Sequence, residues 1–315
     1  LEFLSYSMDE PAAGPGLFPQ YCVSRLASEN VKVCLGGQGG DEIYGGYARH
    51  AIAYLEFALR AAISGEDGGA DGIGLDQFAS QLPLLRQYVP MLKRQFSKGL
   101  FDAPDLRYFQ LLDRSAGVLD AFSGDVRGSY DKELVFQKFS AIFNDSESES
   151  LFNRVTYFDM MASLPALLQV EDRVSMAVSL ESRVPLLDPD VMNFVASVPP
   201  RIKWKHGELK YLFKQAVKKW LPQSIIERKD KMGFPVPLHL WAQGDSRDFF
   251  CDILLSQRCR ERGLFDAAQV EQLISEEAAF GRGLWGLLQI ELWHRNFVDG
   301  ASNYIHEGDK YATVI

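Results

Sequence analysis

Residues 32–50, KVCLGGQGGDEIYGGYARH, contain six glycines, a glutamine and an Asp-Glu pair. Glycine-rich backbone that follows a strand can bring its amides close to anionic oxygens, so this loop is suited to phosphate. Asp41 and Glu42 would repel a phosphate unless a hard cation such as Mg²⁺ lay between them. The stretch therefore favours a site for an anion and a cation together. A tight turn with Asp41 as a helix N-cap is the structural alternative.

Two known phosphate motifs do not fit this loop. No Lys-Ser or Lys-Thr follows the glycines, as a Walker loop would require, and Glu42 stands where a dinucleotide fingerprint starting at Gly37 would have its last glycine. The loop is therefore not a generic nucleotide motif.

A second stretch, LLQVEDRVSMAVSLESRVPLLDPD at 167–190, places charges on a predicted helix and at its end. Asp172 is an acid on an otherwise apolar helix, where burial without a partner or a role is unfavourable. Glu181 and Arg183 flank the break that Pro185 imposes and are suited to clamping neighbouring loops. Structural ion pairs explain these two residues equally well.

A third stretch, ERKDKMGFPVPLHLW at 227–241, presents Lys231 on a segment that two prolines and a glycine constrain. A lysine held in this way suits a phosphate. A solvated basic turn is the alternative.

The elements that position these residues are predicted from hydrophobic periodicity. We expect an extended segment at 1–7, a helix at 18–28 and a buried strand at 31–35, and we expect helices to dominate the rest of the chain. The predicted helices span 48–63, 78–99, 104–122, 131–143, 154–163, 165–180, 189–198, 207–220, 246–257, 266–278 and 284–297.

Composition excludes several classes of protein. The chain has 315 residues, is 47% hydrophobic and carries a net charge of -9, which argues against a nucleic-acid partner. Its four cysteines show no CxxC spacing, so disulfides and zinc are not expected and a reducing cytoplasm fits best. No apolar run approaches the length of a membrane span, about 18 residues, so no membrane contact is expected.

The three stretches GGQGGDEIYGGYARH, QVEDRVSMAVSLESRVPLLD and KMGFPVP, in this order, resemble the synthetase domain of glutamine-hydrolysing asparagine synthetases. Weaker matches are MDEP (8–11), GELKYLFKQA (207–216), LPQSIIERKDK (221–231) and LWGLLQIELWHRNF (284–297). The resemblance covers nearly the whole chain, although residues 50–150 match only in character.

The resemblance implies an α/β, adenine-nucleotide alpha-hydrolase-like (Rossmann-like) parallel-sheet domain, of which this chain is mostly the helical C-terminal part. Residues 1–50 would form the end of the nucleotide-binding sheet with its glycine-rich loop, and 51–315 the predominantly helical remainder. The activity implied is a carbon-nitrogen ligation that uses ATP and Mg²⁺. ATP adenylates the side-chain carboxylate of aspartate and releases Mg-pyrophosphate, and ammonia from glutamine then gives asparagine and AMP.

The resemblance also implies roles for individual residues. Asp41 corresponds to the Mg²⁺ ligand, Lys231 to the lysine that neutralises the phosphates during adenylation, and Asp172 to the acid on the helix that faces the substrate. Glu181 and Arg183 correspond to the pair that braces the pocket. The loop that binds ATP and substrate would comprise Gly36, Gly37, Gln38, Gly39 and Gly40.

Two departures from the family pattern leave alternatives open. Many members have a serine or threonine, then a glycine and an acid, where this chain has Gly36, Gly37 and Gln38, so proton removal falls to solvent or to another group. The family's Ser-Gly-Gly-x-Asp-Ser pyrophosphate loop and its glutaminase domain are also not found. Amidation of another carboxylic acid, β-lactam closure and a non-catalytic scaffold remain possible.

The missing parts lead to expectations about the chain taken alone. The glutaminase domain and the pyrophosphate loop would precede Leu1 in the same polypeptide. We therefore expect this chain by itself to be inactive, to bind ATP weakly and to leave a sheet edge open. Association through that edge would give aggregates or a homodimer.

Overall fold

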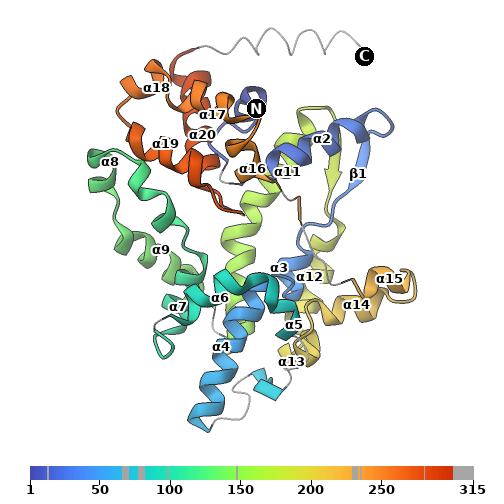
Figure 1. Ribbon diagram of the computed structural model, residues 1–315. Helices are drawn as coiled ribbons and strands as arrows, with labels where there is room; N and C mark the ends of the chain where they lie inside the picture. The colour runs from blue at the N-terminus through green and yellow to red at the C-terminus, as the bar shows by residue number, and fades with distance from the viewer. Residues whose placement is uncertain are drawn as a thin grey trace.

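The computed structural model describes residues 1–12, 14–65, 71–76, 82–97, 99–146, 148–228, 233–234, 236–279 and 281–300. Figure 1 shows a largely helical molecule with one small parallel sheet at its side. In chain order the elements, with η for a 3-10 or π-helical turn, are α1 (Glu2–Ser7), α2 (Leu17–Ser28), β1 (Val33–Leu35), α3 (Gly40–Tyr44), α4 (Ala48–Ser64), α5 (Leu82–Leu85), η3 (Arg86–Tyr88), α6 (Val89–Phe96), α7 (Pro104–Leu112), η4 (Ser115–Gly117), η5 (Leu119–Ala121), α8 (Gly124–Ser129), α9 (Lys132–Asn144), α10 (Leu151–Phe158), η6 (Asp159–Ser163), α11 (Leu164–Met176), β2 (Glu181–Arg183), η7 (Pro185–Leu187), α12 (Pro189–Ser197), α13 (Pro200–Lys203), η8 (Lys205–Gly207), α14 (Tyr211–Val217), α15 (Gln223–Ile226), α16 (Leu238–Gln243), α17 (Arg247–Leu254), α18 (Gln257–Glu261), α19 (Ala267–Glu276), α20 (Gly283–Trp293) and η9 (His294–Val298).

The sheet joins two segments that lie far apart in the sequence. β1 and β2 pair in parallel, with Val33 opposite Glu181 and Leu35 opposite Arg183. The Glu181 amide donates to the Lys32 carbonyl at 2.9 Å, and the Gly36 amide donates to the Arg183 carbonyl at 2.7 Å. Both strands therefore end at the same edge, where the glycine-rich loop begins. The sequence analysis did not predict the β2 strand.

Two expectations about the first residues were wrong. β1 is not buried, because Val33 and Leu35 are 46% and 75% exposed. Within the described part of the chain β2 is its only strand neighbour, so much of its apolar surface is left uncovered. Residues 2–7 form the helix α1 rather than an extended segment, because Leu4 and Met8, four residues apart, are buried together in the core.

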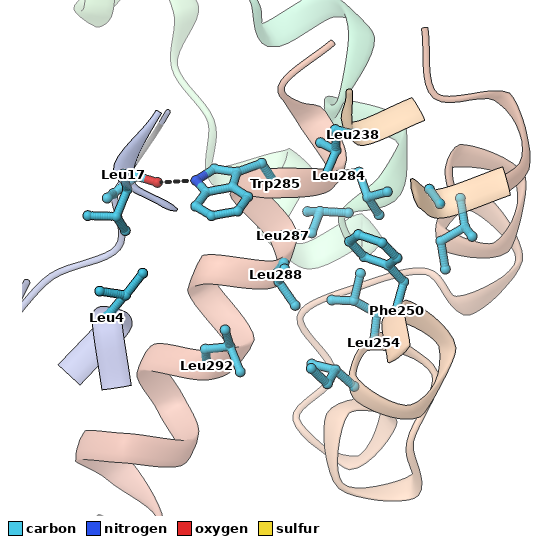
Figure 2. Packing of buried hydrophobic residues seen from close by; sticks show 14 of the residues in the cluster. Leu4, Leu17, Leu238, Phe250, Leu254, Leu284, Trp285, Leu287, Leu288 and Leu292 are labelled. Atoms are coloured by element: carbon cyan, nitrogen blue, oxygen red, sulfur yellow. Dashed lines mark hydrogen bonds between the residues drawn. The ribbon is translucent and has the colours of Figure 1, made fainter. Parts of the chain in front are cut away.

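Two large hydrophobic clusters stabilise the helical part. The first surrounds α20, whose buried Leu284, Leu287, Leu288 and Leu292 pack with α17 and with Leu4 and Leu17 from the first two helices (Figure 2). Trp285 is buried in the same cluster, and its Nε1 donates to the Ala12 carbonyl at 2.9 Å. α20 is thereby fixed to residues that precede the sheet.

The second cluster joins α4, α7, α9 and α10 around Tyr54, Tyr108, Phe143, Phe152 and Trp204, all buried. The predicted helices at 48–63 and 131–143 are confirmed here as α4 and α9. The helix predicted at 104–122 was too long, because α7 ends at Leu112 and the Asp113 carboxylate accepts the Ser115 amide in a turn.

One nearly continuous helical rod links the two clusters. α10, η6 and α11 follow one another from Leu151 to Met176, and η6 is a π-helical turn in the middle. Figure 1 shows this rod through the centre of the molecule, with β2 after its end.

The structure bears on the state of the cysteines and on membrane-spanning helices. All four cysteines are free thiols, as predicted. Among the residues with assigned positions, no helix has both the length and the apolar character that crossing a membrane requires.

Candidate functional site

The glycine-rich loop turns tightly between β1 and α3. Gly39 has φ of 87°, and a Cβ there would lie 2.2 Å from Leu187 Cδ2 in η7. Gly45, at the other end of α3, has φ of 67°, and a Cβ there would lie 2.6 Å from the Phe152 ring. Both the backbone conformation and the close packing therefore require glycine at these two positions.

Asp41 lies on α3 and faces a lysine. Its Oδ1 is 2.8 Å from Lys210 Nζ, and the two side chains are 22% and 26% exposed. A Cβ at Gly46 would lie 1.9 Å from the same oxygen, so the pair rests directly on the backbone of that residue. Asp41 is not the helix N-cap, because Gly39 occupies that position without a side-chain cap. The alternative interpretation of Asp41 is therefore wrong.

Sequence reasoning did not single out Lys210. The signal for it was the basic cluster at 201–219, which was equally compatible with a solvated helix face. Lys210 directly precedes α14 and has a left-handed backbone conformation, with φ of 58°. Residues of α14 contact α3, the helix that carries Asp41.

The residues around Asp41 fit a metal that arrives with a nucleotide. No group of three or more His, Cys, Asp or Glu side chains suited to a metal occurs among the residues whose positions are described. Mg²⁺ is commonly held by one or two carboxylates together with substrate phosphates rather than by a complete protein cage. The partly exposed carboxylate of Asp41, at the end of a glycine-rich loop, agrees with that kind of site.

Glu42, the second acid of the pair, has a structural position. It is 1% exposed and accepts a hydrogen bond from the Tyr47 hydroxyl. Burial and the neighbouring Glu42 raise the pKa of Tyr47, so the phenol stays protonated and keeps donating. Adjacent acids that look alike in the sequence thus face different surroundings.

A buried ionic cluster follows directly along the chain. Arg49 lies over the Tyr47 ring, 3.7 Å from its centroid, and its Nη2 is 2.8 Å from Asp159 Oδ2. His50 Nε2 is 2.6 Å from the same oxygen, and Asp159 is completely buried in η6. Burial alone would raise the pKa of Asp159, but the His50 hydrogen bond and the Arg49 charge hold it below its usual range.

On α11 the structure distinguishes two adjacent acids. Asp172 is exposed, so the argument from the cost of its burial does not apply. Glu171 is 9% exposed, and its Oε1 accepts a hydrogen bond from Ser182 Oγ in β2. A Cβ at Gly36 would lie 2.1 Å from that Oε1. Glu171 therefore lies against the start of the glycine-rich loop.

Glu171 was not among the predicted site residues, although a signal for it existed. The buried residues of α11 are Leu164, Glu171, Val174 and Ser175, which follow a helical spacing and leave Asp172 outside. Of the two adjacent acids, only Glu171 lies on this buried face of the helix, so the helical spacing alone would have selected it.

The pairing of β1 with β2 brings Glu181 and Arg183 beside the loop. Arg183 Nη2 is 2.8 Å from Glu181 Oε1, but the two side chains are 64% and 51% exposed. An exposed pair of this kind contributes little to stability. Lys231 lies outside the described residues.

Comparisons with known proteins identify the family of this chain. The family model described as asparagine synthase matches residues 1–295. The glutamine-hydrolyzing asparagine synthetase 1 of Bacillus subtilis is 28% identical over 301 residues, which are 92% of this chain and 44% of that protein. A Mycobacterium bovis protein assigned by name to the same synthetases is 27% identical over 305 residues, 93% of this chain and 43% of its own length.

The chain thus spans less than half of the length of these two relatives. The family match confirms the predicted adenine-nucleotide alpha-hydrolase-like fold class, here with a small parallel sheet and a mostly helical part. The match runs from the first residue through α20 and so includes the glycine-rich loop, the α11 acids and β2. This chain belongs to the asparagine synthase family.

Proposed function

We propose that this chain is the synthetase part of an enzyme that converts aspartate to asparagine at the expense of ATP. A carboxylate is a poor electrophile, and joining it to AMP supplies a good leaving group. In this proposal ATP and aspartate form a β-aspartyl-adenylate with release of Mg-pyrophosphate, and ammonia then displaces AMP. A glutaminase domain of the same polypeptide would supply the ammonia from glutamine.

The observation that carries the proposal is the position of Asp41. Its partly exposed carboxylate lies on α3, directly after the loop that leaves the β1–β2 strand ends, and Lys210 is its counterion. Ligands of open α/β sheets bind outside the carboxyl ends of the strands, which is where this loop lies.

The chain's own residues would then position charge. The backbone of Gly36, Gly37, Gln38, Gly39 and Gly40 would approach the phosphates, and Arg183 and Glu181 would border the pocket at the end of β2. Mg²⁺ held by Asp41 would neutralise phosphate charge when bound. Lys231 would meet that charge in the transition state, and Asp172 would face the substrate from α11.

The test is exchange of labelled pyrophosphate into ATP by the natural full-length polypeptide. Reversible adenylation predicts exchange that depends on aspartate and on Mg²⁺. Exchange that needs a different acid would change the substrate and leave the chemistry in place. A complete lack of exchange with any carboxylic acid would contradict the enzyme and support a non-catalytic scaffold.

A second candidate is amidation of another carboxylic acid, or ring closure of the β-lactam kind. It is favoured by Gly36 and Gln38, which replace residues typical of the loop in asparagine synthetases. A panel of dicarboxylic amino acids in the same assay separates the two candidates, because only the true substrate supports exchange.

A further inference from the structure

A carboxylate from another element reaches the start of the glycine-rich loop. Glu171 extends from α11 to the end of β1, where its Oε1 and Cδ lie 2.1 Å and 3.2 Å from the place that a Cβ of Gly36 would occupy. The same oxygen accepts the hydroxyl of Ser182, which pairs with Cys34 in the sheet. Glu171 can occupy this position only because residue 36 has no side chain.

One oxygen of this carboxylate remains available. Oε1 accepts the hydrogen bond from Ser182, and among the residues that the structure describes no hydrogen bond engages Oε2. A carboxylate fixed through one oxygen, with the other unengaged, is arranged to accept a proton.

The loop itself offers no such group. Gln38, two residues beyond Gly36, is a neutral amide that cannot accept a proton at ordinary pH. Two residues of chain span about 7 Å at most, so Glu171 lies in the neighbourhood of that position. The loop thus has glycine at 36 and an amide at 38, and the carboxylate beside it comes from α11.

We propose that Glu171 is the general base for the attack of ammonia on the acyl-adenylate, an inference that rests on the proposed function. The nitrogen lone pair forms the C–N bond, and the nitrogen of the resulting tetrahedral adduct carries an extra proton. Glu171 accepts that proton, the bond between the acyl carbon and the AMP oxygen breaks, and AMP leaves with its electron pair. Solvent then takes the proton from Glu171, so the step needs no further reactant.

The experiment separates the two half-reactions in the natural full-length polypeptide. Glu171→Gln should lower amide formation from ammonium by about 10²–10³-fold, the range expected for a lost general base. Aspartate-dependent exchange of pyrophosphate into ATP should change by less than about threefold, because adenylation precedes the proton transfer. The glutamine oxygen can still accept the Ser182 hydroxyl, so the support of β2 is kept.

Two further variants exclude a purely structural role. Adding Gln38→Glu to Glu171→Gln places a carboxylate back in the loop and should restore amide formation at least tenfold. Ser182→Ala, the matched control, removes the hydrogen bond but keeps the carboxylate, and its effect on amide formation should stay below tenfold.

A second nucleophile gives an independent readout. Hydroxylamine is a weaker base than ammonia, so its adduct loses a proton more readily without help. The defect of Glu171→Gln should therefore be smaller with hydroxylamine than with ammonium. Equal defects with both nucleophiles would overturn the assignment.

The outcomes distinguish this inference from the proposed function. If the wild-type protein exchanges pyrophosphate and Glu171→Gln forms the amide at the wild-type rate, Glu171 is not the base. If exchange falls as much as amide formation, Glu171 acts in adenylation or in folding, and the inference is again overturned. If the wild-type protein shows no exchange with any acid, no acyl-adenylate forms, and both proposals fail.

Discussion

Asp41 and Asp159 are two carboxylates held by neighbouring helices, and their surroundings differ in burial. Asp41 is partly exposed and pairs with the ammonium of Lys210. Asp159 is completely buried and receives Arg49 and His50, with the Tyr108 hydroxyl 3.4 Å away. The first carboxylate is accessible to a ligand, whereas the second is enclosed by protein.

The degree of burial separates acids that support the fold of this chain from acids that are accessible to a ligand. Removing one partner of a buried ion pair leaves an uncompensated charge and is strongly destabilising. A partly exposed pair contributes far less to stability, about 1 kcal/mol at most. Substitutions at the two acids should therefore separate stability from activity, and the experiments below test that separation.

Asp159→Asn should have the largest effect and should act on folding. It leaves the Arg49 and His50 side chains beside a neutral amide, and the free energy of unfolding should fall by about 3–5 kcal/mol at neutral pH. Urea unfolding of the variant and of the wild-type protein measures this difference. An unchanged free energy of unfolding would show that the cluster does not support the fold.

The same acid predicts a pH dependence. The folded-state pKa of Asp159 lies below its unfolded value, which is near 3.9, so its contribution is complete above that pH. The contribution is lost as the pH falls through the folded pKa. The stability gap between wild type and Asp159→Asn should consequently narrow in acid, and a gap that widens there would contradict the assigned direction.

Asp41→Asn should act on activity. If Asp41 holds the cation at the phosphates, pyrophosphate exchange should fall by about 10²–10³-fold, comparable to the loss of one strong electrostatic contact. The free energy of unfolding should change by less than about 1 kcal/mol, because the Lys210 pair is partly exposed. A wild-type rate of pyrophosphate exchange in Asp41→Asn would show that Asp41 is not part of the site. A large decrease in its free energy of unfolding would show that Asp41, like Asp159, supports the fold.

The local sequence predicted the elements better than their burial. Periodicity identified α4 and α9, and glycine spacing identified the loop after β1. Burial of a strand depends on its neighbours in space, and the sequence analysis did not predict β2 as a strand or the exposure of Leu35.

The candidate site was predictable only in part for the same reason. Asp41 was found from its own surroundings in the sequence. Lys210 and Glu171 reach the loop only through tertiary packing of α14 and α11, and no local pattern specifies such a contact. Helical periodicity would have indicated the buried face of α11. It would not have indicated that Glu171 on this face lies against Gly36.

Gly36→Ala sharpens the comparison within the loop. The added methyl would meet Glu171 Oε1, the end of a flexible side chain, so the carboxylate should move away at little cost to stability. Amide formation should fall by about tenfold or more while pyrophosphate exchange stays within about threefold, as expected for a displaced base. Gly37→Ala, where nothing lies within 4 Å of the added atom, is the matched control for a methyl group in the loop. Equal losses in both variants would mean that the loop backbone is sensitive and that Glu171 is not displaced.

Lys203→Met should have a smaller effect on stability than Asp159→Asn, and it tests whether a buried charge in this protein always needs a partner. Lys203 is 3% exposed, and its Nζ lies 3.4 Å from Asn153 Oδ1 and 5.5 Å from the centroid of the Phe152 ring. None of the described carboxylates forms an ion pair with it. Burial lowers the pKa of this amine to about 8, opposed by the charge of Asp71. Between that pH and the unfolded value near 10.4 the unfolded chain binds more protons, so the stability of the wild-type protein should rise with pH in this window.

Lys203→Met removes both this rise and the unfavourable burial of a cation at neutral pH. The variant should be more stable than the wild-type protein by about 1–2 kcal/mol at pH 7. Thermal unfolding of both proteins at pH 7 and pH 10 provides the measurement, because other titrating groups are common to the two. A variant that is less stable than wild type at pH 7 would show that Lys203, like Asp159, is compensated by its surroundings, and the contrast between the two buried charges would not hold.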